Sequence, residues 1–364
     1  MSTQEGGSGK SRKDGTNRAR QRASPEQAFR RILAAGSAAM ATMRSKASSS
    51  SPAAWVKAHV PLAWRRPRRL VLAGAVLLAA ILLIIATRPP ATTTPHHPAP
   101  GTTVFQVGQR VVLRFVHSTG SVHVSAGPDG QVSITENRNG ITDAIHTSYQ
   151  QQGEVITVTV SVDNGLLTAT WVDFTVAVPQ DTSATVATAA GTLRAAGLTG
   201  NFVLQDTNGS IWAANLSGVI ALQTASGSIN TSHVSGQVSA STSNGTITTV
   251  STRLRGHSLM QADNGTISFH GNLDPGCDAV FRNTNGATAV TVPGSSSILV
   301  DARARSGSIN SGFSSVHVVP DPGGRVAHGR IGRGAPARLS MQTIGGSIDL
   351  APASTHHLPG RRLT

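Results

Sequence analysis

The sequence predicts an all-β protein, a single-stranded β-solenoid preceded by one transmembrane helix and a disordered basic tail. Three observations support this prediction: glycines recur every nine residues from Gly200, residues 70–86 form an uncharged apolar run, and aromatic residues make up only 4% of the 364 residues while glycines number 38. A chain rich in Gly, Ser, Thr, Val and Ile but poor in aromatic residues favours many short strands joined by tight turns.

The basic charge is concentrated at the N-terminus. Of the net charge of +14, residues 1–69 contribute 15 Lys and Arg against 3 Asp and Glu, or +12, and the rest of the chain contributes +2. We expect this tail to be cytoplasmic and largely disordered, because it is polar and has no hydrophobic period. A short amphipathic helix at 25–46 could contact anionic lipid at the inner leaflet. Nucleic acid is not an expected partner, since no motif interleaves aromatic and basic residues.

The apolar run Leu70–Ala86 (LVLAGAVLLAAILLIIA) predicts a transmembrane helix over residues 70–87. Four arginines stand just before it: Arg65, Arg66, Arg68 and Arg69. Because positive charge stays in the cytoplasm, we expect a single-pass protein of the cell membrane, with a cytoplasmic N-terminus and an extracytoplasmic C-terminal domain. The alternatives are a buried helix in a soluble protein, which the arginines disfavour, and a cleaved signal peptide, which the 69 preceding residues disfavour.

A Pro/Thr-rich linker is predicted at residues 88–103 (RPPATTTPHHPAPGTT). This composition favours an extended polyproline II spacer of about 3 Å per residue. It would separate the β domain from the membrane.

The nine-residue repeat predicts the solenoid. Its structural turn glycines are Gly200, Gly209, Gly218, Gly227, Gly236 and Gly245, followed at wider spacing by Gly265, Gly286, Gly307 and Gly346. Two residues after each second glycine stands a core-ladder isoleucine: Ile211, Ile229, Ile247, Ile267, Ile309 and Ile348. Apolar and polar residues alternate within each unit, which is typical of strands with one buried face. Strand and turn returning at this period is the pattern of stacked coils, and Gly tolerates the positive φ of their corners.

The repeat also sets the expected domain boundaries. Residues 104–190 carry less regular strands and are expected to lead into and cap the solenoid, and its rungs are expected over 191–351. A Gly/Arg-rich stretch at 320–337 is expected to be a loop, with one last rung after it and a disordered tail at 352–364. Calcium is not expected, because the turns hold Thr, Ser and Asn where a calcium-binding repeat needs carboxylates.

Several motifs in order resemble a bacterial family known as "putative adhesin", formerly a domain of unknown function. They are VDFTVAVP at 172–179, SATVATAAGTL at 183–193, the serial NGSI, SGSI and NGTI motifs, and RLSMQTIGGSIDL at 338–350. The similarity covers about residues 103–351. It implies a right-handed, β-helix-like solenoid on the cell envelope, often behind a single membrane helix.

No motif for catalysis, cofactor binding or metal binding is present, so no enzyme, cofactor or metal is expected. There is no H-E-x-x-H, no Gly-x-Ser-x-Gly on a strand–helix turn, and only one cysteine, Cys277, expected to be a buried apolar residue. Three classes of function remain: adhesion or display toward polysaccharide or a surface protein, envelope-stress sensing through the basic tail, and a polysaccharide-acting enzyme. The last is disfavoured because no cluster of carboxylates is evident, Asp301 and Asp349 being the one candidate pair.

Overall fold

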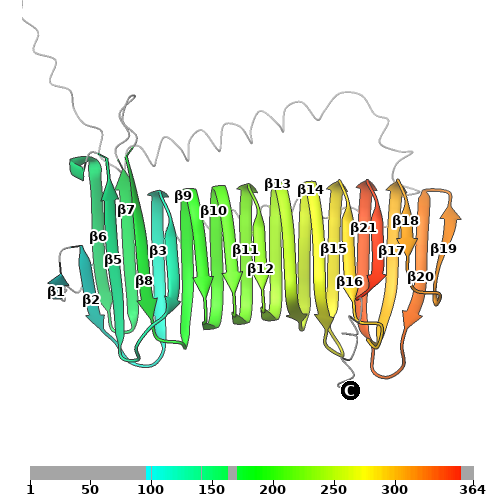
Figure 1. Cartoon of the computed structure of the whole chain (residues 1–364), viewed down its shortest axis with the longest axis horizontal. Helices are drawn as coiled ribbons and strands as arrows, with labels where there is room; N and C mark the ends of the chain where they lie inside the picture. Colours follow the sequence, from blue (N-terminus) through cyan, green and yellow to red (C-terminus); the bar gives the residue numbers. More distant parts are fainter. Residues whose placement is uncertain (1–95, 100, 141, 163–169, 354–364) are drawn as a thin grey trace, which may run out of the picture. The chain divides into compact units, whose positions relative to one another are not determined.

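The computed structural model describes residues 96–99, 101–140, 142–162 and 170–353 (Figure 1). This part of the chain is all-β, as predicted, and its strands are hydrogen-bonded into a 22-stranded system with a short 3-10 turn at Thr142–Ala144. The strands are β1 (His96–Ala99), β2 (Thr102–Gln106), β3 (Val111–Thr119), β4 (Val122–Ala126), β5 (Gln131–Asn139), β6 (Ile145–Gln152), β7 (Val155–Val162), β8 (Trp171–Val178), β9 (Thr182–Ala196), β10 (Thr199–Ala214), β11 (Ser217–Ser226), β12 (Ile229–Ser232), β13 (Ser235–Leu254), β14 (His257–Leu273), β15 (Asp278–Asn285), β16 (Thr288–Val292), β17 (Ile298–Ser306), β18 (Ile309–Ser311), β19 (Val316–Asp321), β20 (Gly324–Ile331), β21 (Ala337–Gly345) and β22 (Ile348–Pro352).

Several predicted segments lie outside the described residues. They are the basic tail at 1–69 with its helix at 25–46 and its arginines Arg65, Arg66, Arg68 and Arg69, the membrane helix at 70–87, and the C-terminal tail from 354 onward. Among the residues that are described, no helix has the length and apolar character needed to cross a membrane.

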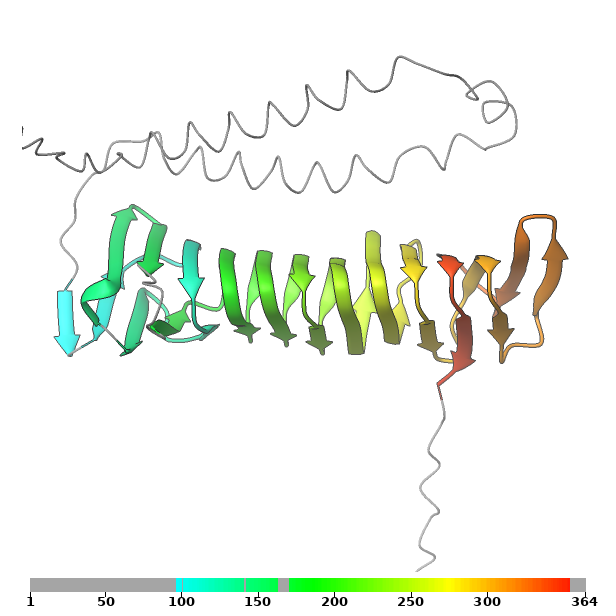
Figure 2. The ribbon, with the colours of Figure 1, turned by 90° about the horizontal axis from the view of Figure 1, so that it is seen from above.

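Successive turns of the chain stack in parallel register. Gly200 pairs with Gly218, and Gly218 with Gly236, so each residue lies beside its equivalent 18 positions later. We call each such turn a rung. Later rungs are longer, since Asn244 pairs with Asn264 and Asn264 with Asn285. Figure 2 shows the central rungs, drawn in green to yellow, following one another in a single row.

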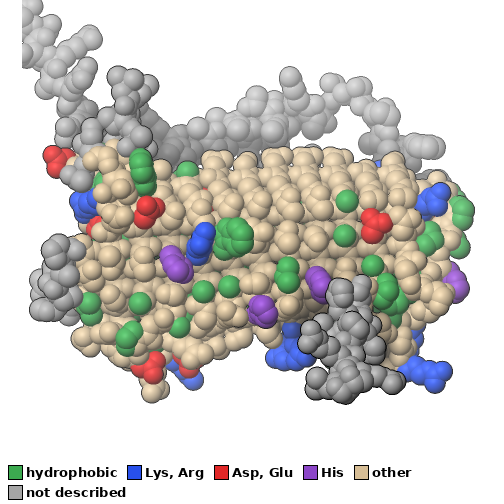
Figure 3. Space-filling model, viewed as in Figure 1, with side chains coloured by type: hydrophobic (Ala, Val, Ile, Leu, Met, Phe, Trp, Pro, Cys, Tyr) green, Lys and Arg blue, Asp and Glu red, His purple; other side chains and the backbone are tan. Residues whose placement is uncertain are grey.

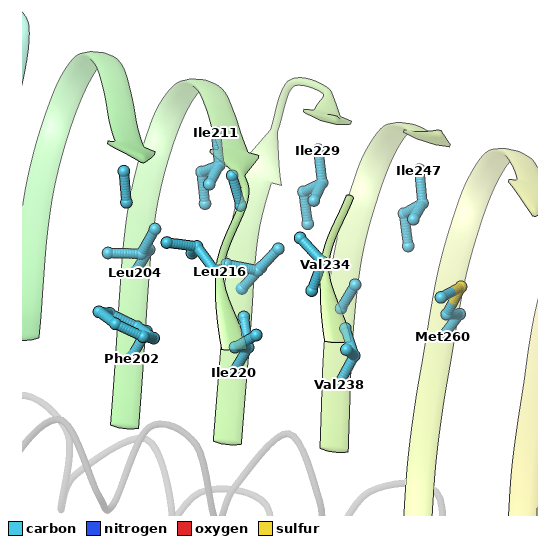
Figure 4. Packing of buried hydrophobic residues seen from close by; sticks show 14 of the residues in the cluster. Phe202, Leu204, Ile211, Leu216, Ile220, Ile229, Val234, Val238, Ile247 and Met260 are labelled. Atoms are coloured by element: carbon cyan, nitrogen blue, oxygen red, sulfur yellow. The ribbon is translucent and has the colours of Figure 1, made fainter. Parts of the chain in front are cut away.

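An aliphatic ladder fills the inside of the rungs. Ile211, Ile229 and Ile247 pair in register and are fully buried, and Figure 4 shows them repeated from rung to rung. The same ladder contains Leu193 before them and, after them, Ile267, Thr288, Ile348 and Ile309. Burying one such side chain contributes about 1.5–3 kcal/mol, and each ladder residue is covered by the rungs on both sides. The rungs therefore stabilise one another.

Thr288 interrupts this ladder and predicts a stabilising substitution. It lies between Ile267 and Ile348, is 1% exposed, and its Oγ1 has no hydrogen-bond partner among the described residues. We expect Thr288→Val to raise the free energy of unfolding by about 1 kcal/mol, because it removes an unsatisfied buried hydroxyl at nearly constant volume. Urea unfolding followed by circular dichroism measures the change. The matched control is Thr231→Val, which should destabilise, because the buried hydroxyl of Thr231 lies 3.2 Å from that of Thr252.

The rungs begin earlier than predicted. β3 and β4 pair in parallel with β9, which pairs in parallel with β10, so regular stacking already includes residues 111–126 and 182–196. The expected boundary at 191 is therefore wrong. The pattern was missed because residues 127–181 separate these two rungs in the sequence. These residues contain β5 to β8, of which β7 and β8 pair in parallel with β3 and β4 and so extend the stacking by a further rung. The antiparallel pairs at this end are β5 with β2 and β8, and β6 with β7.

The sequence order suggests that the last rung lies at the end of the row, but in the structure it does not. β21 and β22 pair in parallel with β15 and β16 on one side and with β17 and β18 on the other. Figure 1 shows this rung in red between the yellow and the orange strands. One edge of β17 pairs antiparallel with β20. The C-terminal rung therefore pairs with the other edge of β17, which faces β15.

Two segments that were expected to be a loop and a linker contain β-strands instead. The stretch 320–337, expected to be a loop, contains β20, which forms an antiparallel hairpin with β19 and continues the sheet beyond β17. Its arginines and glycines are compatible with a strand because most of its side chains face solvent at the end of the row. The predicted linker at 88–103 contains β1 and the start of β2, which pair antiparallel.

The turn glycines form two columns. One contains Gly200, Gly218 and Gly236; the other contains Gly209, Gly227, Gly245, Gly265, Gly286, Gly346 and Gly307. At Gly227 the backbone has φ +148°, and a Cβ would lie 1.9 Å from the carbonyl oxygen of Gly209. Gly245 meets the carbonyl of Gly227 at the same 1.9 Å without a positive φ. Glycine is therefore required mainly because successive backbones approach closely, rather than by turn conformation alone.

Candidate ligand-contact face

An exposed tryptophan lies on an outward face of the central rungs. Trp212 is 47% exposed and stands between Ile211 and Ala213, which are buried, so the alternation of the strand directs its indole outward. Arg194 on β9 and His123 on β4 occupy the equivalent positions of the neighbouring rungs, because His123 pairs with Arg194 and Arg194 with Trp212. The stacking of rungs thus brings together three residues that are 71 and 18 positions apart in sequence.

The guanidinium of Arg194 contacts the indole of Trp212. Its central carbon lies 5.8 Å from the ring centroid, a cation–π arrangement. Among the described residues Arg194 has no carboxylate within ion-pair distance, so its charge is available to a ligand.

Small polar residues surround this pair. The column two positions before Trp212 holds hydroxyls on consecutive rungs: Thr192, Ser210, Ser228, Thr246 and Thr266. The column two positions after it holds Ala196, Ala214 and Ser232. Trp212 therefore rises above short side chains. The middle column contains His123, Arg194, Trp212 and Asn230. We call the outward residues of the three columns, on the rungs of these four residues, the Trp212 face. In Figure 3 the central rungs of the face in view are mostly tan, with few charged side chains.

The interior contains a polar column that sequence reasoning missed. Its members pair from rung to rung and are nearly all polar: His117, Thr188, Asp206, Thr224, Thr242, Ala262, Asn283 and Thr343. Thr224 and Thr242 each donate a hydroxyl hydrogen bond of 3.2 Å to a glycine carbonyl of the preceding rung. Asn283 donates its amide to the carbonyl of Gly265 at 2.9 Å. These three members thus satisfy backbone carbonyls at glycine corners, whereas the hydroxyls of Thr188 and Thr343 have no hydrogen-bond partner among the described residues.

Two titratable members of this column have shifted pKa values. Burial raises the pKa of Asp206 to about 6, although the nearby backbone amides of Asn208 and Thr207 partly oppose this. Burial lowers the pKa of His117 to about 4, because the ring is 3% exposed and packs edge-on against Phe115 and Phe174. Burial therefore disfavours the charged form of both side chains, so that His117 is neutral at pH 7 and Asp206 ionises only above about pH 6.

The residues singled out from the sequence lie in the scaffold and not on the Trp212 face. The predicted glycines and isoleucines form the corner columns and the internal ladder, and Cys277 is buried, with its pKa raised to about 11 by burial. Asp301 and Asp349 lie on different outward columns: Asp349 accepts a hydrogen bond from Asn310 at 2.7 Å, and Asp301 lies 3.8 Å from His328. No group of three or more metal-ligating side chains occurs in the described ranges. The sequence could have indicated that Trp212 faces outward, because it directly follows the ladder isoleucine Ile211 and side chains alternate along a strand.

Comparison with solved structures finds matches of low sequence identity and low TM-score. A "putative lipid binding protein" from Parabacteroides distasonis ATCC 8503 is 13% identical, with a TM-score of 0.41, over 74% of this chain and 100% of that chain. A "putative cell adhesion protein" from Clostridium sporogenes ATCC 15579 is 11% identical, with a TM-score of 0.24, over 71% and 100%. A "putative adhesin" from Parabacteroides merdae ATCC 43184 is 10% identical, with a TM-score of 0.32, over 70% and 95%.

The last of these structures carries the same description as the family that the sequence resembles. No family model matches the chain, and no curated protein matches its sequence. Similarities this low do not carry a ligand or an activity over to this chain.

Proposed function

We propose that this chain is a non-enzymatic protein of the bacterial cell envelope that contacts acidic polysaccharide through its Trp212 face. In this proposal a right-handed β-solenoid is displayed outside the cell, anchored by a transmembrane helix at 70–87. The cytoplasmic tail at 1–69 lies against anionic lipid of the inner leaflet. Adhesion or surface interaction follows from display of this face outside the cell.

The observation that carries the proposal is the exposed Trp212 with Arg194 beside it, which has no carboxylate partner in the part of the chain that the structure describes. An indole presents a rigid apolar surface that can stack on the apolar face of a sugar ring, and it costs little conformational entropy to hold in place. The guanidinium offers two parallel donors to a carboxylate or sulfate. Hydroxyls of the neighbouring column, such as Ser210 and Ser228, can exchange hydrogen bonds with sugar hydroxyls.

The regularity of the face suits a polymer better than a small molecule. Rungs repeat about every 4.8 Å, so equivalent polar side chains recur along the row at nearly constant spacing. A polysaccharide lying along the row could contact several rungs at once, and many weak contacts would then add through multivalency. Envelope-stress sensing through the basic tail remains a prediction from the sequence, and no observation on the described residues favours it.

Affinity electrophoresis of the full chain in detergent tests the proposal. Polygalacturonate in the gel should retard the chain, and Trp212→Ala should weaken the apparent affinity about tenfold, because it removes both the stacking surface and the partner of Arg194. Dextran serves as the neutral polymer and should retard the chain less.

Trp171→Ala is the matched control. Trp171 is also an exposed tryptophan, at 41%, but it lies on β8, outside the Trp212 face. Its loss should leave retardation unchanged. Equal loss in both variants, or a wild-type chain that neither polymer retards, would contradict the proposal.

A further inference from the structure

The C-terminal rung occupies a slot between two rungs that precede it in the sequence. Backbone hydrogen bonds hold it on both sides: Gly286 donates to the carbonyl of Gly345 at 3.0 Å, and Gly346 donates to the carbonyl of Ser306 at 3.0 Å. Inside the slot, four apolar side chains of this rung are almost fully buried: Leu339, Met341, Ile348 and Leu350. The rung formed by β21 and β22 is therefore an integral part of the core.

The slot is complete only after the last part of the chain has been made. β15 to β20 all precede β21, so during synthesis the two walls of the slot exist before the rung that fills it. The outer wall is fixed as a unit, because β17 pairs along its length with β20, from Ile298 opposite Ile331 to Ala304 opposite Arg325. Until the C-terminal rung arrives, both walls expose unpaired strand edges, which can accept any matching strand.

A single short tether connects this rung to the rest of the described chain. Residues 332–336 (GRGAP) join β20 to β21, and a fully extended segment of five residues spans at most about 18 Å. Gly332 and Gly334 have φ +65° and +110°, and nothing lies within 4 Å of a Cβ built at Gly334. The carbonyl of Gly334 accepts hydrogen bonds from Arg330 at 2.6 Å and Ser297 at 3.2 Å, and that of Pro336 accepts one from Gly276 at 3.3 Å. Opening the tether breaks these three bonds, whereas moving an internal rung would also require breaking its connections to the neighbouring rungs at both ends.

We propose that the slot between β15–β16 and β17–β18 also accepts the C-terminal rung of a second copy of this chain, so that two copies exchange their last rungs as they fold. The slot matches this partner residue by residue, because the second copy supplies the same sequence in the same parallel register. A short tether gives its own rung an effective concentration of about millimolar, so exchange competes only when protein concentration approaches that value during folding.

Disulfide trapping in the full chain tests this proposal. Arg282 of β15 and Gln342 of β21 are direct partners in register and both face outward. Parallel neighbours about 4.8 Å apart lie within the range that a disulfide can bridge. Arg282→Cys and Gln342→Cys chains are mixed in urea, refolded together in detergent, and oxidised. The native cysteine, Cys277, is 1% exposed and should not compete.

The expected result is a disulfide-linked dimer of the two variants after refolding at about 300 μM, and at least tenfold less after refolding at about 3 μM. Variants that are folded separately and then mixed should not cross-link, since the rung is held on both sides. A chain with both cysteines should instead close its disulfide internally at low concentration.

A matched pair of internal positions provides the control. Gln205→Cys and Gln223→Cys place cysteines on β10 and β11, which are also direct partners in register, but neither rung is terminal. This pair should give no mixed dimer at either concentration. Absence of the 282–342 dimer at high concentration, or an equal yield from the control pair, overturns the proposal. So does failure of the doubly substituted chain to close its disulfide.

Discussion

Replacing Gly227 with alanine is expected to lower the free energy of unfolding by more than about 4 kcal/mol, because two penalties coincide. Its φ of +148° lies in a region that L-residues rarely adopt, and the new Cβ would lie 1.9 Å from the carbonyl oxygen of Gly209. That carbonyl cannot easily move, because it also accepts the hydroxyl of Thr224 at 3.2 Å. Urea unfolding of the full chain in detergent, followed by the β signal in circular dichroism, measures the loss.

Gly294→Ala is the control for this substitution. Nothing lies within 4 Å of a Cβ built at Gly294, and its φ is not positive, so the change should alter stability by less than about 0.5 kcal/mol. If Gly227→Ala unfolded within about 1 kcal/mol of the parent chain, the close stacking of glycine corners would be refuted.

Asp206→Asn is expected to stabilise the protein by about 2–3 kcal/mol at pH 7.5. Asp206 is 5% exposed, and the nearby backbone amides of Asn208 and Thr207 only partly offset the cost of burying its charge. It occupies a column in which Thr224, Thr242 and Asn283 donate to glycine carbonyls of the preceding rung. An ionised carboxylate cannot donate, whereas an asparagine amide can, as Asn283 shows.

The gain should depend on pH in a defined direction. The pKa of Asp206 rises from 3.8 to about 6 on folding, so the folded state disfavours the charged form. Its contribution to stability is fully present below pH 3.8 and is lost as the pH rises through 6. The stability difference between Asp206→Asn and the parent should therefore be large at pH 7.5 and shrink toward zero near pH 4.

Comparing the two chains at each pH cancels the contribution of other groups, including His117. Asp263→Asn is the matched control, because Asp263 faces outward on β14 and is partly exposed, and it should shift stability by less than about 0.5 kcal/mol at either pH. A stability difference that did not change with pH would show that burial does not raise the pKa of Asp206.

The sequence was sufficient to predict the central rungs. The glycines and ladder isoleucines, such as Gly227 and Ile229, are local signals that repeat at a fixed spacing, and their positions in the structure follow that spacing. The wider spacing of the later glycines also predicted the longer rungs. In the structure Asn244 pairs with Asn264, and Asn264 with Asn285, at this wider spacing.

The order of the last rungs could not be read from spacing. Ile309 and Ile348 both fit the position beside Thr288, and only the pairing of β17 with β20 decides between them. β20 itself was hidden because its Gly/Arg-rich sequence lacks the alternation of apolar residues that marks a half-buried strand. Register between segments far apart in sequence depends on tertiary contacts and not on local pattern.

Chemistry that depends on neighbouring rungs was likewise invisible. The Trp212 face needs His123 to lie beside Arg194, across 71 residues of sequence. A column of positive φ without glycine was missed for a different reason: Asn215, His233 and Ser251 adopt φ of 51–54° at 18-residue intervals, but their residue types differ and serine is not one that favours this conformation. Their common conformation is imposed by the stacking.

Pulsed electron–electron spin resonance on one outward column tests the stacked architecture most directly. One such column includes Arg194. It also contains Ala289 five rungs away, Asp349 six rungs away and Asn310 seven rungs away. With spin labels at 194 and one other position, the account predicts distances of about 24 Å to 289, about 29 Å to 349 and about 34 Å to 310. A distance to 310 shorter than that to 349, or distances that do not increase along the series, would contradict it.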